Sequence, residues 1–147
     1  MLLNEIKVYH GTSGHVSSQL NAPLFLTTNK QGARWYANNR HEKGAILQGD
    51  LDPGKVLNVI KDGDEEFLEI AKEAGIKWTE DPYFKCPEIA KHSVYYGDNW
   101  LDMVYIPAFQ KELKKNGYDS ILAHDVLENT LIKTYIIFDT QRFQIKQ

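Results

Sequence analysis

The amino-acid sequence predicts a mixed α+β fold, organised as one domain over residues 1–147. Strand patterns concentrate near both ends of the chain, and the clearest helical pattern lies in the middle. This order differs from the regular strand–helix alternation that produces a parallel sheet. The Gly-x-Gly-x-x-Gly signature of dinucleotide-binding folds is also absent from the sequence. The chain is long enough to bury a hydrophobic core of its own.

The first part of the chain predicts two strands followed by a helix. Glu5–His10 is expected to be a strand because apolar and charged residues alternate along it. Gly11–Asn21 is rich in glycine, serine and asparagine, which indicates a loop. Leu24–Thr27 is a second, shorter strand. Thr28 or Asn29 then caps a helix that continues to about residue 40.

The next segment predicts two further strands and an amphipathic helix. Gly44–Leu51 and Lys55–Ile60 have strand patterns, and Asp52-Pro53-Gly54 between them is a turn sequence. Glu65–Ala74 places its apolar residues on one helical face. Gly75 is expected to end this helix.

The remainder predicts a helical region followed by strands. Residues 78–97 are expected to form a loop and then a helix that begins near Pro87. Residues 99–115 are helical in pattern, with a break at Pro107. The strands expected after this region are Tyr118–Ala123, Leu131–Asp139 and a last edge at Phe143–Ile145.

Composition restricts the classes of partner. The net charge is −3 and no stripe of lysine and arginine is present, which makes nucleic acid a less favoured partner. Cys86 is the single cysteine, so no internal disulfide forms and a cytoplasmic location is expected. No apolar run has the length of a membrane span, and the N-terminus lacks a signal-peptide pattern. No contact with a membrane is therefore expected. The histidines and Cys86 lack metal-ligand spacing, so no bound metal is expected either.

Four residues together suit a nicotinamide dinucleotide. Cleavage of the nicotinamide–ribose bond requires flat walls for the ring, backbone hydrogen bonds for its carboxamide and a partner for a ribose hydroxyl. His10 can bind the ribose, and Gly11 can offer its backbone because no Cβ blocks the approach. Phe25 and Tyr36 can form the two walls. Taken singly, His10 and Tyr36 are better explained by ordinary structural roles, a strand-end histidine bonded to backbone and a core aromatic, whereas the combination favours a binding site for NAD.

The same segments resemble a known enzyme family. Tyr-His-Gly-Thr at 9–12, Phe-x-Thr-Thr at 25–28 and Ala-x-x-Tyr at 33–36 resemble the H-Y-E branch of ADP-ribosyltransferases, which includes diphtheria toxin and the poly(ADP-ribose) polymerases. Residues 134–139 are similar to the strand that carries the third motif of that family. Residues 144–146 resemble an ending common in phage-borne members.

The resemblance implies a fold and a set of NAD contacts. The fold is a split β-sandwich of two small mixed sheets with flanking helices, and NAD lies in the cleft between the sheets. His10 would hold a ribose hydroxyl, Gly11 would bind the nicotinamide amide, and Tyr36 would stack on the nicotinamide opposite Phe25. The expected contacts also include the hydroxyl residues of the same motifs, Thr12, Thr27 and Thr28.

Two positions depart from the family pattern. Ala33 stands where polymerase-type members place a serine that contacts the carboxamide. Thr134 stands where the family has its glutamate, on the strand face shared by Ile132 and Ile136, which is expected to point inward. A threonine hydroxyl can bind a ribose hydroxyl but carries no charge to stabilise an oxocarbenium. The departure argues against chain elongation and favours transfer of a single ADP-ribose, or no catalysis.

Two other acids are candidates for the missing charge. Asp125 and Glu128 are expected in the loop between the last two long strands, which borders the cleft in the family fold. Asp125 directly follows a predicted strand and is the preferred group to activate the acceptor. A solvated loop carboxylate with no catalytic role is the equal alternative. Asp139 is interpreted as structural.

These observations predict an NAD-dependent mono-ADP-ribosyltransferase whose acceptor is a protein side chain. The likeness to phage-borne members suggests an effector in the host cytoplasm that modifies a host or defence factor. One alternative is a catalytically inactive protein that binds NAD, ADP-ribose or a protein partner. Another alternative is transfer of ADP-ribose to nucleic acid, which some relatives of this fold perform.

Overall fold

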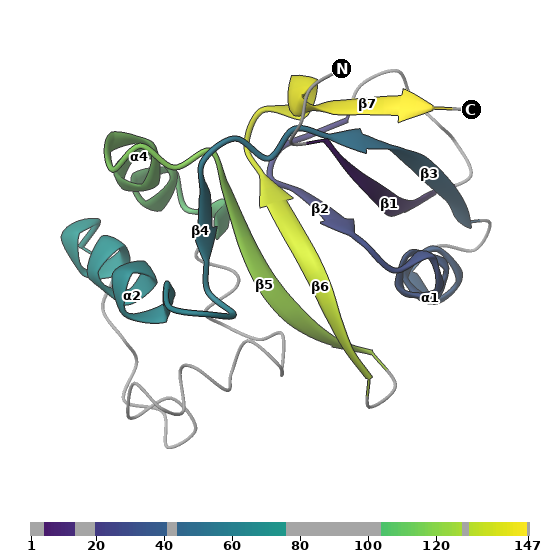
Figure 1. The fold of residues 1–147 in the computed structure, drawn as a ribbon, viewed down its shortest axis with the longest axis horizontal. Coiled ribbons are helices and arrows are strands. Elements are labelled where there is room, and N and C mark those ends of the chain that lie inside the picture. Colours follow the sequence, from purple (N-terminus) through teal and green to yellow (C-terminus); the bar gives the residue numbers. More distant parts are fainter. Residues whose placement is uncertain (1–4, 14–19, 41–43, 76–103, 128–129, 147) are drawn as a thin grey trace.

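The computed structural model describes residues 5–13, 20–40, 44–75, 104–127 and 130–146. Seven strands form one mixed sheet in the order β4-β5-β6-β2-β1-β3-β7 (Figure 1). The strands are β1 (Ile6–Ser13), β2 (Leu24–Thr27), β3 (Gly44–Leu51), β4 (Val56–Asn58), β5 (Ser120–Leu127), β6 (Thr130–Ile137) and β7 (Phe143–Lys146). Only β4 and β5 pair in parallel, and all other neighbours are antiparallel. The α+β class predicted from the sequence is confirmed.

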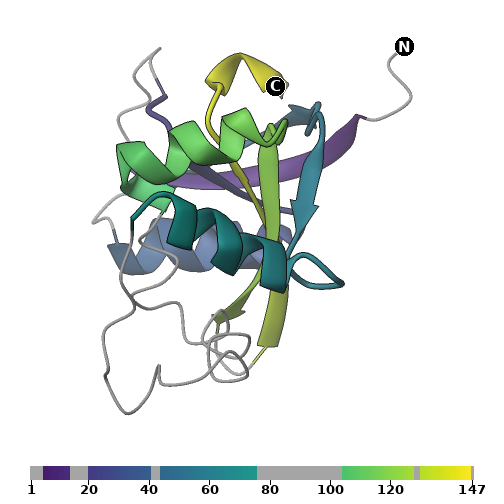
Figure 2. The ribbon, with the colours of Figure 1, turned by 90° about the vertical axis from the view of Figure 1, so that its left-hand side faces the viewer.

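The expectation of two separate sheets needs correction, because the hydrogen-bonded ladder is continuous. The link between its two halves is nevertheless small: β1 and β2 share a single residue pair, Tyr9 with Thr27. The neighbouring ladders hold four pairs between β2 and β6 and eight between β1 and β3. β1 and β5 consequently run at a steep angle to one another (Figure 2). The sheet is thus one continuous ladder that bends sharply at β1 and β2. We call the place where these two strands diverge from their single pair the split.

Two hydrophobic clusters stabilise this bent sheet. The cluster of the bend takes side chains from both halves: Val8, Leu24, Leu26, Leu47, Leu51, Ile137 and Phe143. The second cluster joins β4, β5 and β6 to the helices, and its largest members are Phe67, Ile70, Phe109, Leu113, Ile121 and Ile136. Consecutive residues of β6 therefore belong to different clusters, as expected for a strand that is covered on both faces.

Helix α1 (Lys30–Arg40) packs against β1 and β3 (Figure 1). Of the two predicted caps, Asn29 is the one used, since its Oδ1 accepts hydrogen bonds from the backbone N–H groups of Gln31 and Gly32 at 2.8 and 3.3 Å. The approach to β3 is close. A Cβ added to Gly44 would lie 1.9 Å from the carbonyl oxygen of Ala37, so glycine is required there.

Helices α2 (Asp64–Glu73) and α4 (Pro107–Lys115) cover the other half of the sheet, side by side (Figure 2). Gly75 follows α2 with a φ of +80°, which confirms the predicted stop. The predicted break at Pro107 is the beginning of α4, where the fixed φ of proline suits a first helical residue. The helix expected near Pro87 lies outside the described residues.

Three strands differ most from the predictions. β1 continues to Ser13, through part of the predicted loop, because Gly11, Thr12 and Ser13 pair with β3. β4 is only three residues long, and the carbonyl oxygen of Asn58 accepts from three N–H groups in the turn that follows. β5 continues to Leu127, so Asp125 lies within a strand, paired with Ile132, and not in a loop.

The end of the chain agrees more closely with the predictions. β6 ends at Ile137, and Asp139 accepts a hydrogen bond at 3.0 Å from the backbone N–H of Gln141 in the 3₁₀ helix η2 (Thr140–Arg142). This contact confirms a structural role for Asp139. Phe143–Lys146 is an edge strand paired with β3. Within the described ranges, no helix is long and apolar enough to cross a membrane.

Candidate functional site at the split of the sheet

His10 lies in β1, one residue beyond the pair that joins the halves of the sheet. Its Nδ1 is 2.8 Å from the carbonyl oxygen of Phe25 in β2. A carbonyl oxygen can only accept a hydrogen bond, so Nδ1 carries the proton and donates it. In the neutral imidazole, Nε2 is then an acceptor. The side chain thereby makes a contact between β1 and β2 where the backbone ladder has stopped.

A row of cross-strand partners crosses the split beside His10. Gln48 of β3 pairs with Tyr9 of β1, Tyr9 with Thr27 of β2, Thr27 with Thr134 of β6, and Thr134 with Ala123 of β5. Residues paired in this way share one face of a sheet. This set, called the cross-strand row below, brings together two of the threonines singled out in the sequence. His10 is next to the row and not part of it.

Thr27 has a fully engaged hydroxyl. The residue is 5% exposed, and its Oγ1 donates to the carbonyl oxygen of Lys133 and accepts from the backbone N–H of Asn29, both at 3.1 Å. These bonds fix the end of β2 and the beginning of α1 to β6. Thr28 has an exposed side chain, and its backbone N–H donates to the same carbonyl oxygen at 3.3 Å.

Thr134 differs from its neighbour in one respect. It is also 5% exposed, but its Oγ1 is buried and has no hydrogen-bond partner among the described residues. An unsatisfied buried hydroxyl destabilises a protein by about 1–3 kcal/mol, so such groups are rare without a reason. Its burial with Ile132 and Ile136 confirms the inward face predicted from strand alternation.

The aromatic side chains are arranged differently from the expected pair of walls. Phe25 is half-buried, packs on the cluster under α2 and α4, and stacks on Tyr105 with ring centroids 6.1 Å apart and 18° between their planes. Tyr105 is 56% exposed. Tyr105 was not predicted as a site residue, because it lies in the segment predicted to be helical just before the break at Pro107. Tyr36 lies in α1, and its side chain is outside the described part of the structure.

The remaining predicted site residues are placed as follows. Gly11 and Thr12 are half-buried in β1, paired with Ile46 and Ala45 of β3. Asp125 pairs with Ile132, two residues along β5 from the cross-strand row, and its side chain is outside the described part. Glu128 lies outside the described residues. The structure therefore brings the threonine pair to the split but does not place either acid there.

Charge near the cross-strand row is limited. His124 follows Ala123 in β5 and pairs with Lys133 of β6. Burial is the larger cause that lowers the pKa of its imidazole below the ordinary 6.5, and repulsion from Lys133 lowers it further. Burial also raises the pKa of the Tyr135 phenol. Both groups are therefore neutral at pH 7. The described side chains of the row offer hydroxyl and amide groups, which can bind a sugar hydroxyl but cannot balance a cation. Among the described residues, no three His, Cys, Asp or Glu side chains gather where they could hold a metal ion.

No family model matches the chain, and neither a curated protein nor a solved structure matches it significantly. A function for the chain is therefore inferred from the residues at the split.

Proposed function

We propose that the chain is an NAD-dependent mono-ADP-ribosyltransferase. The observation that carries the proposal is the position of His10. Its imidazole is held by the carbonyl oxygen of Phe25 at the bend of the sheet, and β6, two strands away, carries the buried Thr134 hydroxyl, which has no partner among the described residues. A ligand hydroxyl at this place would provide the missing hydrogen bond.

The proposed pose assigns one part of NAD to each group. Nε2 of His10 accepts a hydrogen bond from a hydroxyl of the nicotinamide ribose. The backbone of Gly11, on the same strand, binds the nicotinamide carboxamide. Tyr36 stacks on the nicotinamide ring from α1, and Thr134 binds a second ribose hydroxyl. Phe25 borders the nicotinamide ring and keeps its stacking contact with Tyr105.

The proposed reaction exchanges one bond at the ribose carbon C1′. The bond from C1′ to the nicotinamide nitrogen breaks, nicotinamide leaves as a neutral molecule, and C1′ bonds to a nucleophile on the acceptor. The acceptor loses one proton, which the proposal assigns to Asp125, with Glu128 as the other candidate. Asp125 is two residues from the partner of Thr134, about 7 Å along the strand. The acceptor in this proposal is a protein side chain of a host or defence factor.

A second candidate function is binding without chemistry. Thr134 favours it, because the floor of the site is a neutral hydroxyl where charge stabilisation of an oxocarbenium would be expected. Such a protein would bind NAD or ADP-ribose and leave the nicotinamide bond intact.

One experiment separates these functions. The full chain is incubated with NAD labelled on its adenylate, alone and with a host lysate, and nicotinamide release, label transfer and NAD affinity are measured together. Release with protease-sensitive label supports protein ADP-ribosylation, whereas nuclease-sensitive label would assign nucleic acid as the acceptor. Binding of NAD without release would establish the second function. Failure of the intact protein to bind either NAD or ADP-ribose would overturn both.

A further inference from the structure

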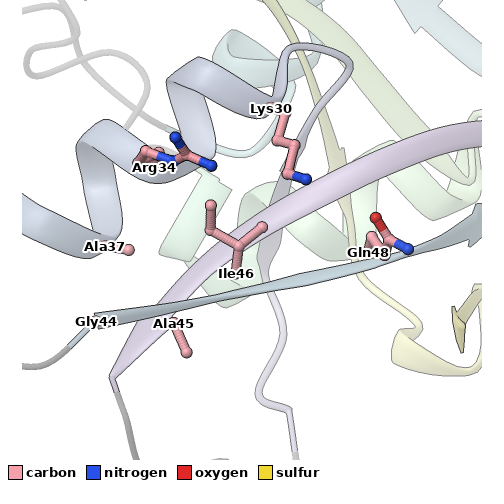
Figure 3. Close-up of a pocket in the computed structure, with 7 residues that line it drawn as sticks. All are labelled: Lys30, Arg34, Ala37, Gly44, Ala45, Ile46 and Gln48. Carbon is pink, nitrogen blue, oxygen red and sulfur yellow. The ribbon is translucent and has the colours of Figure 1, made fainter. Parts of the chain in front are cut away.

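A cavity of about 390 Å³ lies between α1 and β3, on the side of the sheet that carries the cross-strand row (Figure 3). Its volume falls in the range of small-molecule sites. The described lining residues come from these two elements: Lys30, Arg34, Ala37, Gly44, Ala45, Ile46 and Gln48. It is called the α1–β3 pocket below.

The glycine contact described above forms the closed end of this pocket. Because Gly44 lets α1 approach the β3 backbone at Ala37, the helix and the strand diverge from that point. Ile46 rises from β3 toward the two basic side chains of α1 and provides an apolar floor (Figure 3). Gln48 stands farther along the strand, where its amide offers both a donor and an acceptor.

The charge of the α1–β3 pocket is entirely positive. Lys30 and Arg34 are four residues apart on α1, so both heads lie on one helical face. Neither forms an ion pair with a carboxylate in the described part of the chain, and no acidic residue lines the pocket. Asp50, two residues beyond Gln48, is paired with Lys146 at 3.9 Å. The described residues around the two cations therefore leave their charge uncompensated.

The chemistry of this pocket selects an anion with several oxygen atoms. A guanidinium can donate two parallel hydrogen bonds to a phosphate, and an ammonium adds a mobile charge. The backbone N–H groups at the beginning of α1 contribute little, because Asn29 already accepts from Gln31 and Gly32. Recognition would therefore come from the two basic side chains and from Gln48.

We infer that the α1–β3 pocket binds a phosphate-type anion of a small molecule. Two sources share this chemistry: the diphosphate of a dinucleotide, and a separate phosphate-bearing ligand. The first source rests on the proposed function. The register of β1 and β3 supports this source. Ile46 pairs with Gly11 and Gln48 pairs with Tyr9, so the pocket residues of β3 lie one strand spacing, about 5 Å, from β1. Gly11, to which the proposed pose assigns the carboxamide, shares the sheet face of Ile46, whereas His10 pairs with Leu47 and alternates to the opposite face.

The test is calorimetric titration of the full chain, at low and at moderate salt, with pyrophosphate, ADP-ribose, NAD and nicotinamide. The test variant is Lys30→Gln with Arg34→Gln. The matched control is Lys111→Gln with Lys115→Gln, which removes the same charge at the same spacing from exposed positions of α4. We expect pyrophosphate affinity to fall at least about tenfold in the test variant and to change less than about twofold in the control. Thermal melts of both variants verify folding.

The ligand series then identifies the source. If the test variant binds ADP-ribose and NAD more weakly and nicotinamide as before, the anion in the pocket is the diphosphate of the dinucleotide. Weaker pyrophosphate binding with unchanged NAD affinity supports a separate phosphate-bearing ligand. Pyrophosphate binding by a chain that binds no NAD would retain the anion site and reject the proposed function. Absence of pyrophosphate binding to the unmodified chain, or equal affinities in the test and control variants, would overturn the inference.

Discussion

The Nδ1 atom of His10 donates a hydrogen bond to the carbonyl oxygen of Phe25 at 2.8 Å, across the place where β1 and β2 separate. One side chain thus makes the contact that a backbone ladder would otherwise make. The bond also fixes which nitrogen carries the proton, so the two nitrogens of the ring have separable roles. This separation allows the structural and the ligand-binding contributions of His10 to be measured independently.

His10→Asn and His10→Gln test this separation. Asparagine can place an amide N–H near the position of Nδ1, so we expect a stability close to that of the unmodified chain. Asparagine has no atom at the position of Nε2, so the His10→Asn variant should bind NAD roughly tenfold more weakly, which corresponds to the loss of one hydrogen bond. Glutamine reaches the Nε2 position but loses the bond to Phe25, so it should be less stable by about 1 kcal/mol. Urea unfolding and NAD titration check both variants. Wild-type NAD affinity in His10→Asn would show that the histidine is structural only.

Thr134→Val and Thr27→Val form a matched pair, since both residues are 5% exposed and face each other in one ladder. The hydroxyl of Thr27 makes two hydrogen bonds, so its loss should lower the free energy of unfolding by about 1–2 kcal/mol. The hydroxyl of Thr134 makes none with the residues that the structure describes, so its replacement should be neutral or raise stability by up to about 1 kcal/mol. The proposed function predicts weaker NAD binding in Thr134→Val. A large loss of stability there would mean that the hydroxyl has a partner.

Asp125→Asn tests the proposed proton acceptor. Asparagine keeps the size of the side chain but cannot take up a proton, so nicotinamide release should fall at least about tenfold while NAD affinity stays within about twofold. Asp139→Asn is the control, because that carboxylate only caps η2. An unchanged rate in Asp125→Asn would transfer the role to Glu128, which Glu128→Gln then tests.

His124 should make stability depend on pH. Burial and Lys133 hold the pKa of its imidazole below 6.5 in the folded chain. As pH falls below 6.5, the unfolded chain takes up a proton that the folded chain does not, so the free energy of unfolding decreases. The decrease stops once pH is below the folded-state pKa. His124→Gln should remove this component, seen by comparing urea unfolding at about pH 7.5 and about pH 5.5. An NMR titration of the His124 ring that gives an ordinary pKa would contradict it.

The sequence predicted most elements because their local patterns are strong. β2 and β3 have the predicted bounds, and the helices at Lys30–Arg40 and Asp64–Glu73 begin within one residue of expectation. These segments have regular apolar spacing and clear ends at Asn29 or Gly75. The extension of β5 through Asp125 was missed, because pairing with β6 decides it and the polar residues His124 and Asp125 resemble a loop sequence.

The residues of the candidate site could be proposed from the sequence, but their arrangement could not. Alternation correctly placed Thr134 on a buried face, but no pattern could show that its hydroxyl lacks a partner while that of Thr27 has two. Tyr105 could not be predicted to stack on Phe25, because the contact joins residues 80 positions apart. The α1–β3 pocket depends on the approach of Gly44 to Ala37, which is a property of packing and not of local sequence.

The single pair Tyr9–Thr27 has a consequence for how a ligand would affect the folded state. At the bend, the halves of the sheet are joined by this pair, by the His10–Phe25 bond and by one apolar cluster, and the Arg142–Asp119 ion pair adds a link beside β7. A molecule that contacts both β1 and β6 therefore becomes an additional cross-link between them. The free energy of its binding then adds to the free energy needed to separate the two halves of the sheet. Thermal stability would increase with the logarithm of ligand concentration above Kd, and amide hydrogens next to the bend would exchange more slowly.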